Sequence, residues 1–138
     1  MPTMVRFTVP FLLLVAGSSA LSADDRGFRD RQAEKDRTEL AKQLSGLTPG
    51  KPQQCMLQRG NSETVRIGDT ILYKFNRNDV YRTDTNGGCF GLARGDAIIT
   101  RSYTGQLCSG DIIQTVDLVS RVPSGSCAFG PFVRYQKR

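Results

Sequence analysis

Apolar and polar side chains alternate with a period of two over the middle of the chain. Two such runs, 62–67 and 70–76, flank Gly68 and Asp69, a pair that favours a turn. A period of two places successive side chains on opposite faces of a strand, and two runs joined by a short turn are typical of a hairpin. We therefore predict two antiparallel strands here.

Short apolar segments separated by turn-forming residues continue to the end of the sequence. They predict strands at 79–83, 97–103, 107–119 and 127–135, and a loop at 122–126. Gly110 is a candidate bulge within the third of these strands. Pro131 lacks an amide proton, so we expect it at a sheet edge or a bulge. Short strands with turn signals about every ten residues are typical of antiparallel proteins. The predicted fold class is mainly β, a small antiparallel barrel or sandwich.

The amino-terminal residues 1–23 carry one charged side chain, Arg6, then the apolar run 11–16 and a stretch of small residues. This order is typical of a secretory signal peptide, which we expect to be removed near residues 21–24. The apolar run is shorter than the roughly 20 residues that span a membrane. We expect the mature protein to be periplasmic or secreted, without a transmembrane segment.

Residues 24–46 favour a short helix. They are rich in helix formers, and Gly46 provides a stop signal. A narrow apolar stripe at helical spacing comprises Ala33, Leu40, Ala41, Leu44 and Leu47. Such a stripe predicts weak packing on the domain, with partner binding as the alternative. Residues 47–53 contain two prolines and a glycine and are predicted to form a linker before a β-domain at 54–138.

Four cysteines, Cys55, Cys89, Cys108 and Cys127, are present. In an exported protein an even number of cysteines favours disulfides, so we expect two structural cross-links. None of the spacings is C-x-x-C, and without histidine a zinc site would need all four cysteines. Four cysteines allow three pairings, which the sequence does not decide. Because Cys55 begins the first strand and Cys127 the last, we favour Cys55 with Cys127 and Cys89 with Cys108.

Positive charge is concentrated in the β-region. The formal net charge is +6, but residues 24–45 contain six acids and six bases, whereas the remainder to residue 138 contains 12 Lys and Arg against seven Asp and Glu. A basic surface favours anionic partners, although moderate charge also serves solubility alone. The candidate anion-binding residues are Arg66, Lys74 and Arg82. We expect the partner to be an anionic envelope component or another secreted protein.

The complete absence of histidine limits the possible chemistry. It excludes Ser-His-Asp and Cys-His catalysis and every histidine-containing metal site. A pair of carboxylates remains possible, and Glu63, Asp96 and Asp111 are the candidates for testing. The D-T-N-G segment 84–87 lacks the later ligands of a calcium loop and predicts a plain turn. We assign no catalytic residue, cofactor or metal.

Eight aromatic side chains alternate with cations in the β-region, which is one pattern of a base-stacking surface. Because the chain has no tryptophan, we predict that most of them fill the core instead. They are Tyr73, Phe75, Tyr81, Phe90, Tyr103, Phe129, Phe132 and Tyr135.

The cysteines and their neighbours form a pattern that resembles a family of small exported proteobacterial proteins classed only as a domain of unknown function. The resemblance covers residues 53–135 and is carried by Cys55, GGCFGL at 87–92, LCSGDII at 107–113 and CAFGPFVRY at 127–135. Phe90 stands where the family has a proline, and Ala128 and Phe129 stand where it tends to have Gly and Leu. The resemblance implies a shared fold and assigns no catalytic residues.

These observations lead to three hypotheses about function. The first is a non-enzymatic periplasmic or secreted β-protein that binds an envelope component or macromolecule. The second is an inhibitor of a secreted hydrolase that acts through an exposed loop such as 84–95. The third is a small carboxylate-dependent hydrolase of glycans.

Overall fold

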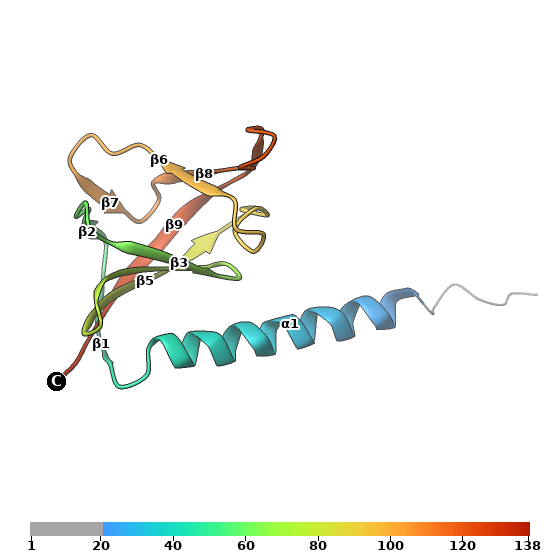
Figure 1. The fold of residues 1–138 in the computed structure, drawn as a ribbon, viewed down its shortest axis with the longest axis horizontal. Coiled ribbons are helices and arrows are strands. Elements are labelled where there is room, and N and C mark those ends of the chain that lie inside the picture. The colour runs from blue at the N-terminus through green and yellow to red at the C-terminus, as the bar shows by residue number, and fades with distance from the viewer. Residues whose placement is uncertain (1–20) are drawn as a thin grey trace, which may run out of the picture.

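The computed structural model describes residues 21–138, so that the predicted signal peptide, residues 1–23, lies almost wholly outside the described residues. One helix precedes nine strands (Figure 1). In chain order the elements are α1 (Leu21–Gln43), β1 (Thr48–Gln53), β2 (Cys55–Leu57), β3 (Glu63–Ile67), β4 (Thr70–Asn76), β5 (Asp79–Asn86), β6 (Ala97–Thr100), β7 (Gln106–Cys108), β8 (Ile112–Val116) and β9 (Pro123–Gln136).

Seven of the strands form one curled antiparallel sheet, a half-barrel. Its order is β3-β4-β5-β9-β8-β6, and β1 pairs with the end of β9 outside that order. The remaining strands, β2 and β7, form a separate two-stranded ribbon. The protein is therefore mainly β and antiparallel, as the alternating pattern predicts.

The main core lies inside the half-barrel. Ile71 and Tyr73 of β4 face Phe129 and Phe132 of β9 there, and all four side chains are buried. The β2–β7 ribbon adds Met56 and Leu107 to this core and so covers the inner face. Because apolar burial is worth about 25 cal/mol per Å², this cluster is the largest source of hydrophobic stabilisation in the fold.

Helix α1 covers part of the outer face. Leu40 and Leu44, with Leu47 just after the helix, pack on Leu72 and Val80 of the sheet. The central residues of β4 are consequently buried on both faces. The rest of the helix extends past the sheet (Figure 1). Gly46, with φ of 75°, follows the end of the helix as predicted. The helix has 23 residues, as many as the predicted segment 24–46, but it begins and ends three residues earlier.

The predicted hairpin at 62–76 is confirmed as β3 and β4, whereas other boundaries differ. The strand predicted at 79–83 continues to Asn86, so most of the plain turn predicted at 84–87 is strand, and the strand predicted at 97–103 ends at Thr100. The 107–119 segment is two strands, because Gly110, with φ of 92°, turns the chain between β7 in the ribbon and β8 in the sheet. The predicted loop 122–126 lies mostly in β9, where pairing with β8 overrides its turn-like composition. The predicted linker 47–53 forms β1, an edge strand that accommodates prolines at a register shift. Pro131 lies within the β5–β9 register shift, the bulged position predicted for it.

Both disulfides are formed, but the favoured pairing was wrong. Cys55 is bonded to Cys108 and Cys89 to Cys127. The error follows from the missed ribbon: Cys55 and Cys108 are register partners in β2 and β7, while Cys89 lies beside β9. The cross-links join residues 53 and 38 positions apart, so each contributes about 4 kcal/mol in the chain-entropy account.

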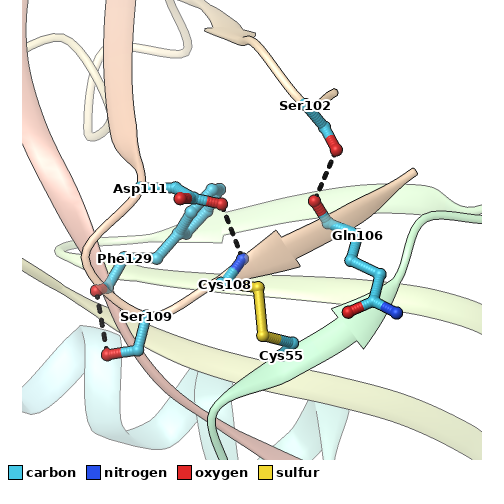
Figure 2. Close-up of a disulfide and its surroundings, with 7 residues drawn as sticks. All are labelled: Cys55, Ser102, Gln106, Cys108, Ser109, Asp111 and Phe129. Atoms are coloured by element: carbon cyan, nitrogen blue, oxygen red, sulfur yellow. Dashed lines mark hydrogen bonds between the residues drawn. A yellow bond between two sulfur atoms is a disulfide. The ribbon is translucent and has the colours of Figure 1, made fainter. Parts of the chain in front are cut away.

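The turn after Cys108 is held by the Asp111 side chain (Figure 2) and by a backbone hydrogen bond to β9. The Asp111 carboxylate accepts a hydrogen bond from the backbone N–H of Cys108 at 2.8 Å. The backbone N–H of Gly110 donates to the carbonyl of Phe129 in β9 at 2.8 Å. These bonds fix the disulfide-linked ribbon against the sheet.

Candidate functional site

The three predicted anion-binding residues do not form one site. Opposite residues in antiparallel pairs share a face, so Lys74 and Arg82 lie on the outer face with Leu72, whereas Arg66 lies on the inner face with Ile71. Lys74 donates to the Gln43 side chain of α1 at 3.0 Å. Two nitrogens of the Arg82 guanidinium contact the Asp84 carboxylate at 3.1 to 3.2 Å. Each of these cations therefore already has a partner within the chain.

Arg66 joins the two edges of the half-barrel. It lies in edge strand β3, and its Nη1 donates to the backbone carbonyl of Asp96 at 2.5 Å, immediately before edge strand β6. This bond connects strands at opposite ends of the sheet order. Arg66 therefore has a structural contact at the seam between the edges.

The candidate catalytic carboxylates are also separated and engaged. Glu63 is exposed on β3, 4.0 Å from the Lys74 amine. Asp111 holds the β7–β8 turn. Asp96 is buried and paired with Arg94 at 2.8 Å. Each carboxylate contacts a different part of the structure, and none of these contacts links one candidate carboxylate to another.

The feature that distinguishes one end of the molecule is a pair of adjacent loops. Loop 87–96 connects β5 to β6, and turn 117–122 connects β8 to β9. We call them together the two-loop face. Their proximity follows from two close approaches: a Cβ added to Gly91 would collide with the Ser124 hydroxyl, and one added to Gly125 would lie 2.6 Å from the Gly88 carbonyl. Both lie on the right of the sheet in Figure 1, the first in yellow and the second in orange-red.

Loop 87–96 is fixed covalently and by hydrogen bonds. Cys89 is buried in its disulfide to Cys127 of β9. The backbone N–H of Leu92 donates to the Cys89 carbonyl at 3.1 Å, and that of Asp96 donates to the Gly91 carbonyl at 3.0 Å. Leu92 is buried in the main core. The loop therefore has a defined conformation although it lies at the surface.

Asp96 connects this loop to the strands beneath it. Only 5% of the residue is exposed. A hydrogen bond from the Ser124 hydroxyl, together with one from Arg94, holds the pKa of the Asp96 carboxyl below its usual range. The Ser124 hydroxyl also lies 3.0 Å from that of Thr115 in β8. An ionised, fully partnered carboxylate suits a structural role, because a general acid needs a raised pKa.

Asp117 organises the second loop in the same way. Its carboxylate accepts hydrogen bonds from the backbone N–H groups of Ser120 at 2.7 Å and Val119 at 2.9 Å. These bonds hold the pKa of the Asp117 carboxyl below its usual range, and the bond from Ser120 has the largest effect. This is the side-chain-to-backbone pattern by which aspartate stabilises tight turns. Arg121 follows with φ of 58°.

On these fixed loops the chain exposes apolar side chains. Phe90 is 80% exposed although it adjoins the buried Cys89, and Val119 is 94% exposed. Leu118 and Val122 are also exposed on the same turn. Single exposed apolar residues are ordinary, but a group of them on two adjacent ordered loops is a candidate interaction surface. Such a face can bind a partner through burial of apolar surface.

The sequence indicated this loop but not its exposed side chains. Most of the eight aromatics were predicted to fill the core, and six of them do so or pack against it: Tyr73, Phe129 and Phe132 are buried, and Phe75, Tyr81 and Tyr135 are partly buried. Phe90 and Tyr103 are the two exposed exceptions. The glycines on both sides of Cys89 and Phe90 were the available signal, because so short a segment cannot turn two successive side chains inward. For turn 117–122 the signal was Leu118 and Val119 standing outside the alternating pattern.

Comparisons with family models, curated proteins and solved structures found no match for this chain. The resemblance to small exported proteobacterial proteins stays a prediction. Within residues 21–138, no helix has the length and apolar character needed to cross a membrane. Among the same residues, no group of three or more cysteine, aspartate or glutamate side chains is placed to hold a metal ion. The two disulfides are consistent with a non-cytoplasmic compartment.

Proposed function

We propose that this chain is an exported, non-catalytic binding protein whose two-loop face docks on another secreted protein. The single observation that carries the proposal is an exposed aromatic ring, Phe90, held on a loop that a disulfide fixes. Export is supported by the predicted signal peptide and by two disulfides, which persist in oxidising compartments. The periplasm or the extracellular space is therefore the proposed site of action.

A protein partner suits this surface because of the energetics of protein interfaces. Aromatic residues are enriched among the few side chains that dominate binding, and they act by filling apolar pockets on the partner. A loop that is already ordered loses little conformational entropy on binding. Phe90 is exposed on such a loop, and Leu118 and Val119 are exposed on the adjacent turn. The partner should therefore present an apolar recess that receives the Phe90 ring.

Affinity measurements on single variants test this proposal. Four versions of the full chain are immobilised: the wild type, Phe90→Ala, Val119→Ser and Tyr103→Ala. Each is incubated with the secreted proteins of the cells that make the chain. Tyr103 is the matched control because it is an exposed aromatic on the separate loop between β6 and β7. The protein retained by the wild type and Tyr103→Ala, but not by the other two, is then purified. Phe90→Ala should weaken its binding by about 30-fold, the value for a hot spot of 2 kcal/mol.

Two outcomes would contradict the proposal. One is retention that Phe90→Ala and Val119→Ser leave unchanged or that Tyr103→Ala abolishes equally. The other is a concentration-dependent dimer of the chain, seen by sedimentation, that Phe90→Ala abolishes. That dimer would mean that a second copy covers the face.

Inhibition of a secreted hydrolase is the more specific form of this function. It is favoured by the disulfide at Cys89, which fixes the residue that precedes Phe90. Because β5 extends to Asn86, the segment available to an enzyme is 87–96 rather than 84–95. If the retained protein is a hydrolase, the wild-type chain should abolish its turnover at saturation and Phe90→Ala should require about 30-fold more protein. Unchanged turnover at saturation would leave a binding function without inhibition.

A further inference from the structure

A basic hollow lies at the opposite end of β9 from the two-loop face. It has a volume of about 460 Å³ and lies between β1 and the last residues of the chain. Four of its nine lining residues have cationic side chains, and none of the nine has an acidic side chain. The cations are Lys51, Arg134, Lys137 and Arg138. Since Arg134 follows Ser124 by ten residues in one strand, the two ends are roughly 30 Å apart.

The shape of the hollow follows from the irregular pairing of β1. The register of β1 on β9 shifts between Pro49 and Pro52, neither of which can donate a backbone hydrogen bond. Gly50 lies between them, and a Cβ there would lie 3.2 Å from the Arg134 carbonyl. The bulged strand carries Lys51, which lines the hollow on the β1 side.

One of the four cations is held in place and the others are uncompensated. The Nε and Nη2 atoms of Arg134 each donate to the Asp79 carboxylate at 2.7 Å, and its guanidinium lies 5.4 Å from the centre of the Tyr81 ring. Within residues 21–138, Lys51 and Lys137 have no salt bridge, and neither has Arg138. The hollow therefore combines a guanidinium held by an ion pair with three cationic side chains that make no salt bridge, and such clustered positive charge attracts a multivalent anion.

We infer that this hollow binds a phosphomonoester group, carried either by a lipid headgroup or by a free phosphorylated compound. Such a group carries between one and a half and two negative charges at neutral pH, and its three oxygens accept hydrogen bonds. The Thr48 hydroxyl and the amides of Gln53 and Gln136 line the same space and supply further donors. The volume lies within the roughly 300 to 1,000 Å³ of small-molecule sites. The inference does not depend on a partner at the two-loop face.

Two probes distinguish the source of the phosphate. Glycerol 3-phosphate, measured by calorimetry, represents the free compound, and phosphatidylcholine vesicles with and without phosphatidic acid, measured by sedimentation, represent the lipid. The wild-type chain should bind at least one probe, with an affinity that falls as salt rises. Stronger binding to phosphatidic acid identifies a headgroup site, and equal binding identifies a site for the phosphate itself.

A pair of double variants tests the location. Lys51→Gln/Lys137→Gln should weaken binding by about tenfold or more, because two charge-assisted contacts are lost. The matched control, Arg101→Gln/Arg121→Gln, removes the same charge from exposed residues that do not line the hollow and should bind like the wild type. Equal weakening by both double variants, or no binding of either probe by the wild type, would overturn the inference.

Discussion

The two ends of β9 are stabilised by different interactions and expose different side chains. At its start, the Cys89–Cys127 disulfide fixes one loop, and the buried Asp96 carboxylate accepts hydrogen bonds from Ser124 and Arg94. The loops at this end expose Phe90 and Val119. At its end, the ion pair of Arg134 with Asp79 fixes a hollow lined by cations. One end thus presents apolar surface on a covalently fixed loop, and the other presents charge.

The difference shows how one strand can serve two kinds of recognition. Apolar contacts lose little strength when salt is added, whereas contacts between exposed charges are screened beyond about 8 Å at physiological ionic strength. Binding at the two-loop face should therefore persist in salt that abolishes binding at the basic hollow. Changes that weaken one end should leave the other intact, because the two are separated by most of the strand.

The largest effect is expected from removing the disulfide at the loop end. Cys89→Ser/Cys127→Ser should lower the free energy of unfolding by about 4 kcal/mol and increase amide exchange in loop 87–96. Cys55→Ser/Cys108→Ser removes the disulfide that closes a loop of similar length, so it should cost a similar amount, but it should leave exchange in loop 87–96 unchanged. Urea unfolding and hydrogen exchange measure both quantities. Equal exchange in the two variants would show that the disulfide does not fix this loop.

A smaller loss is expected at the other end from Asp79→Asn. Asp79 is 8% exposed and accepts two hydrogen bonds from Arg134, so removing its charge should cost about 2 kcal/mol. The control is Asp84→Asn, which breaks the exposed pair with Arg82 and should cost below about 1 kcal/mol. Urea unfolding distinguishes the two. A loss for Asp79→Asn no larger than that for Asp84→Asn would mean that burial adds nothing to the pair.

The smallest effect is expected on the stability of the protein at acidic pH. The pKa values of Asp96 and Asp117 are lowered in the folded protein. The stabilisation that these carboxylates provide is therefore complete above the pKa of aspartate in the unfolded chain, about 3.9, and is lost as the pH falls through their pKa values in the folded protein. The free energy of unfolding should therefore fall less below about pH 4 in Asp96→Asn, and still less in Asp96→Asn/Asp117→Asn, than in the wild type. An equally steep fall in all three would contradict these assignments.

Local pattern was sufficient to predict the hairpin but not the distant pairings. Residues 62–76 form β3 and β4 because their alternation and the Gly68 turn lie within one short segment. The strand character of 48–53 and 123–126 arises from pairing with β9 and β8, and neither segment has an alternating pattern of its own. The disulfide pairing required that same strand order, so it could not be predicted either.

The candidate surfaces were predictable to different degrees. Arg66, Lys74 and Arg82 were the predicted anion-binding residues, but they are engaged within the chain. The basic hollow is lined instead by Lys51, Lys137 and Arg138, which make no salt bridge within residues 21–138. Which cation remains uncompensated depends on the neighbouring strand and not on composition. The exposure of Phe90 likewise depends on the disulfide that holds Cys89 inward.

The central claim, that the two-loop face binds another secreted protein, is tested most directly by cross-linking in the cells that make the chain. A photoreactive benzoylphenylalanine is introduced in place of Phe90 and, separately, in place of the exposed Tyr103. We expect an adduct with one secreted protein from position 90 and none with that protein from position 103. No adduct from position 90, an adduct only with a second copy of the chain, or the same adduct from both positions would contradict the claim.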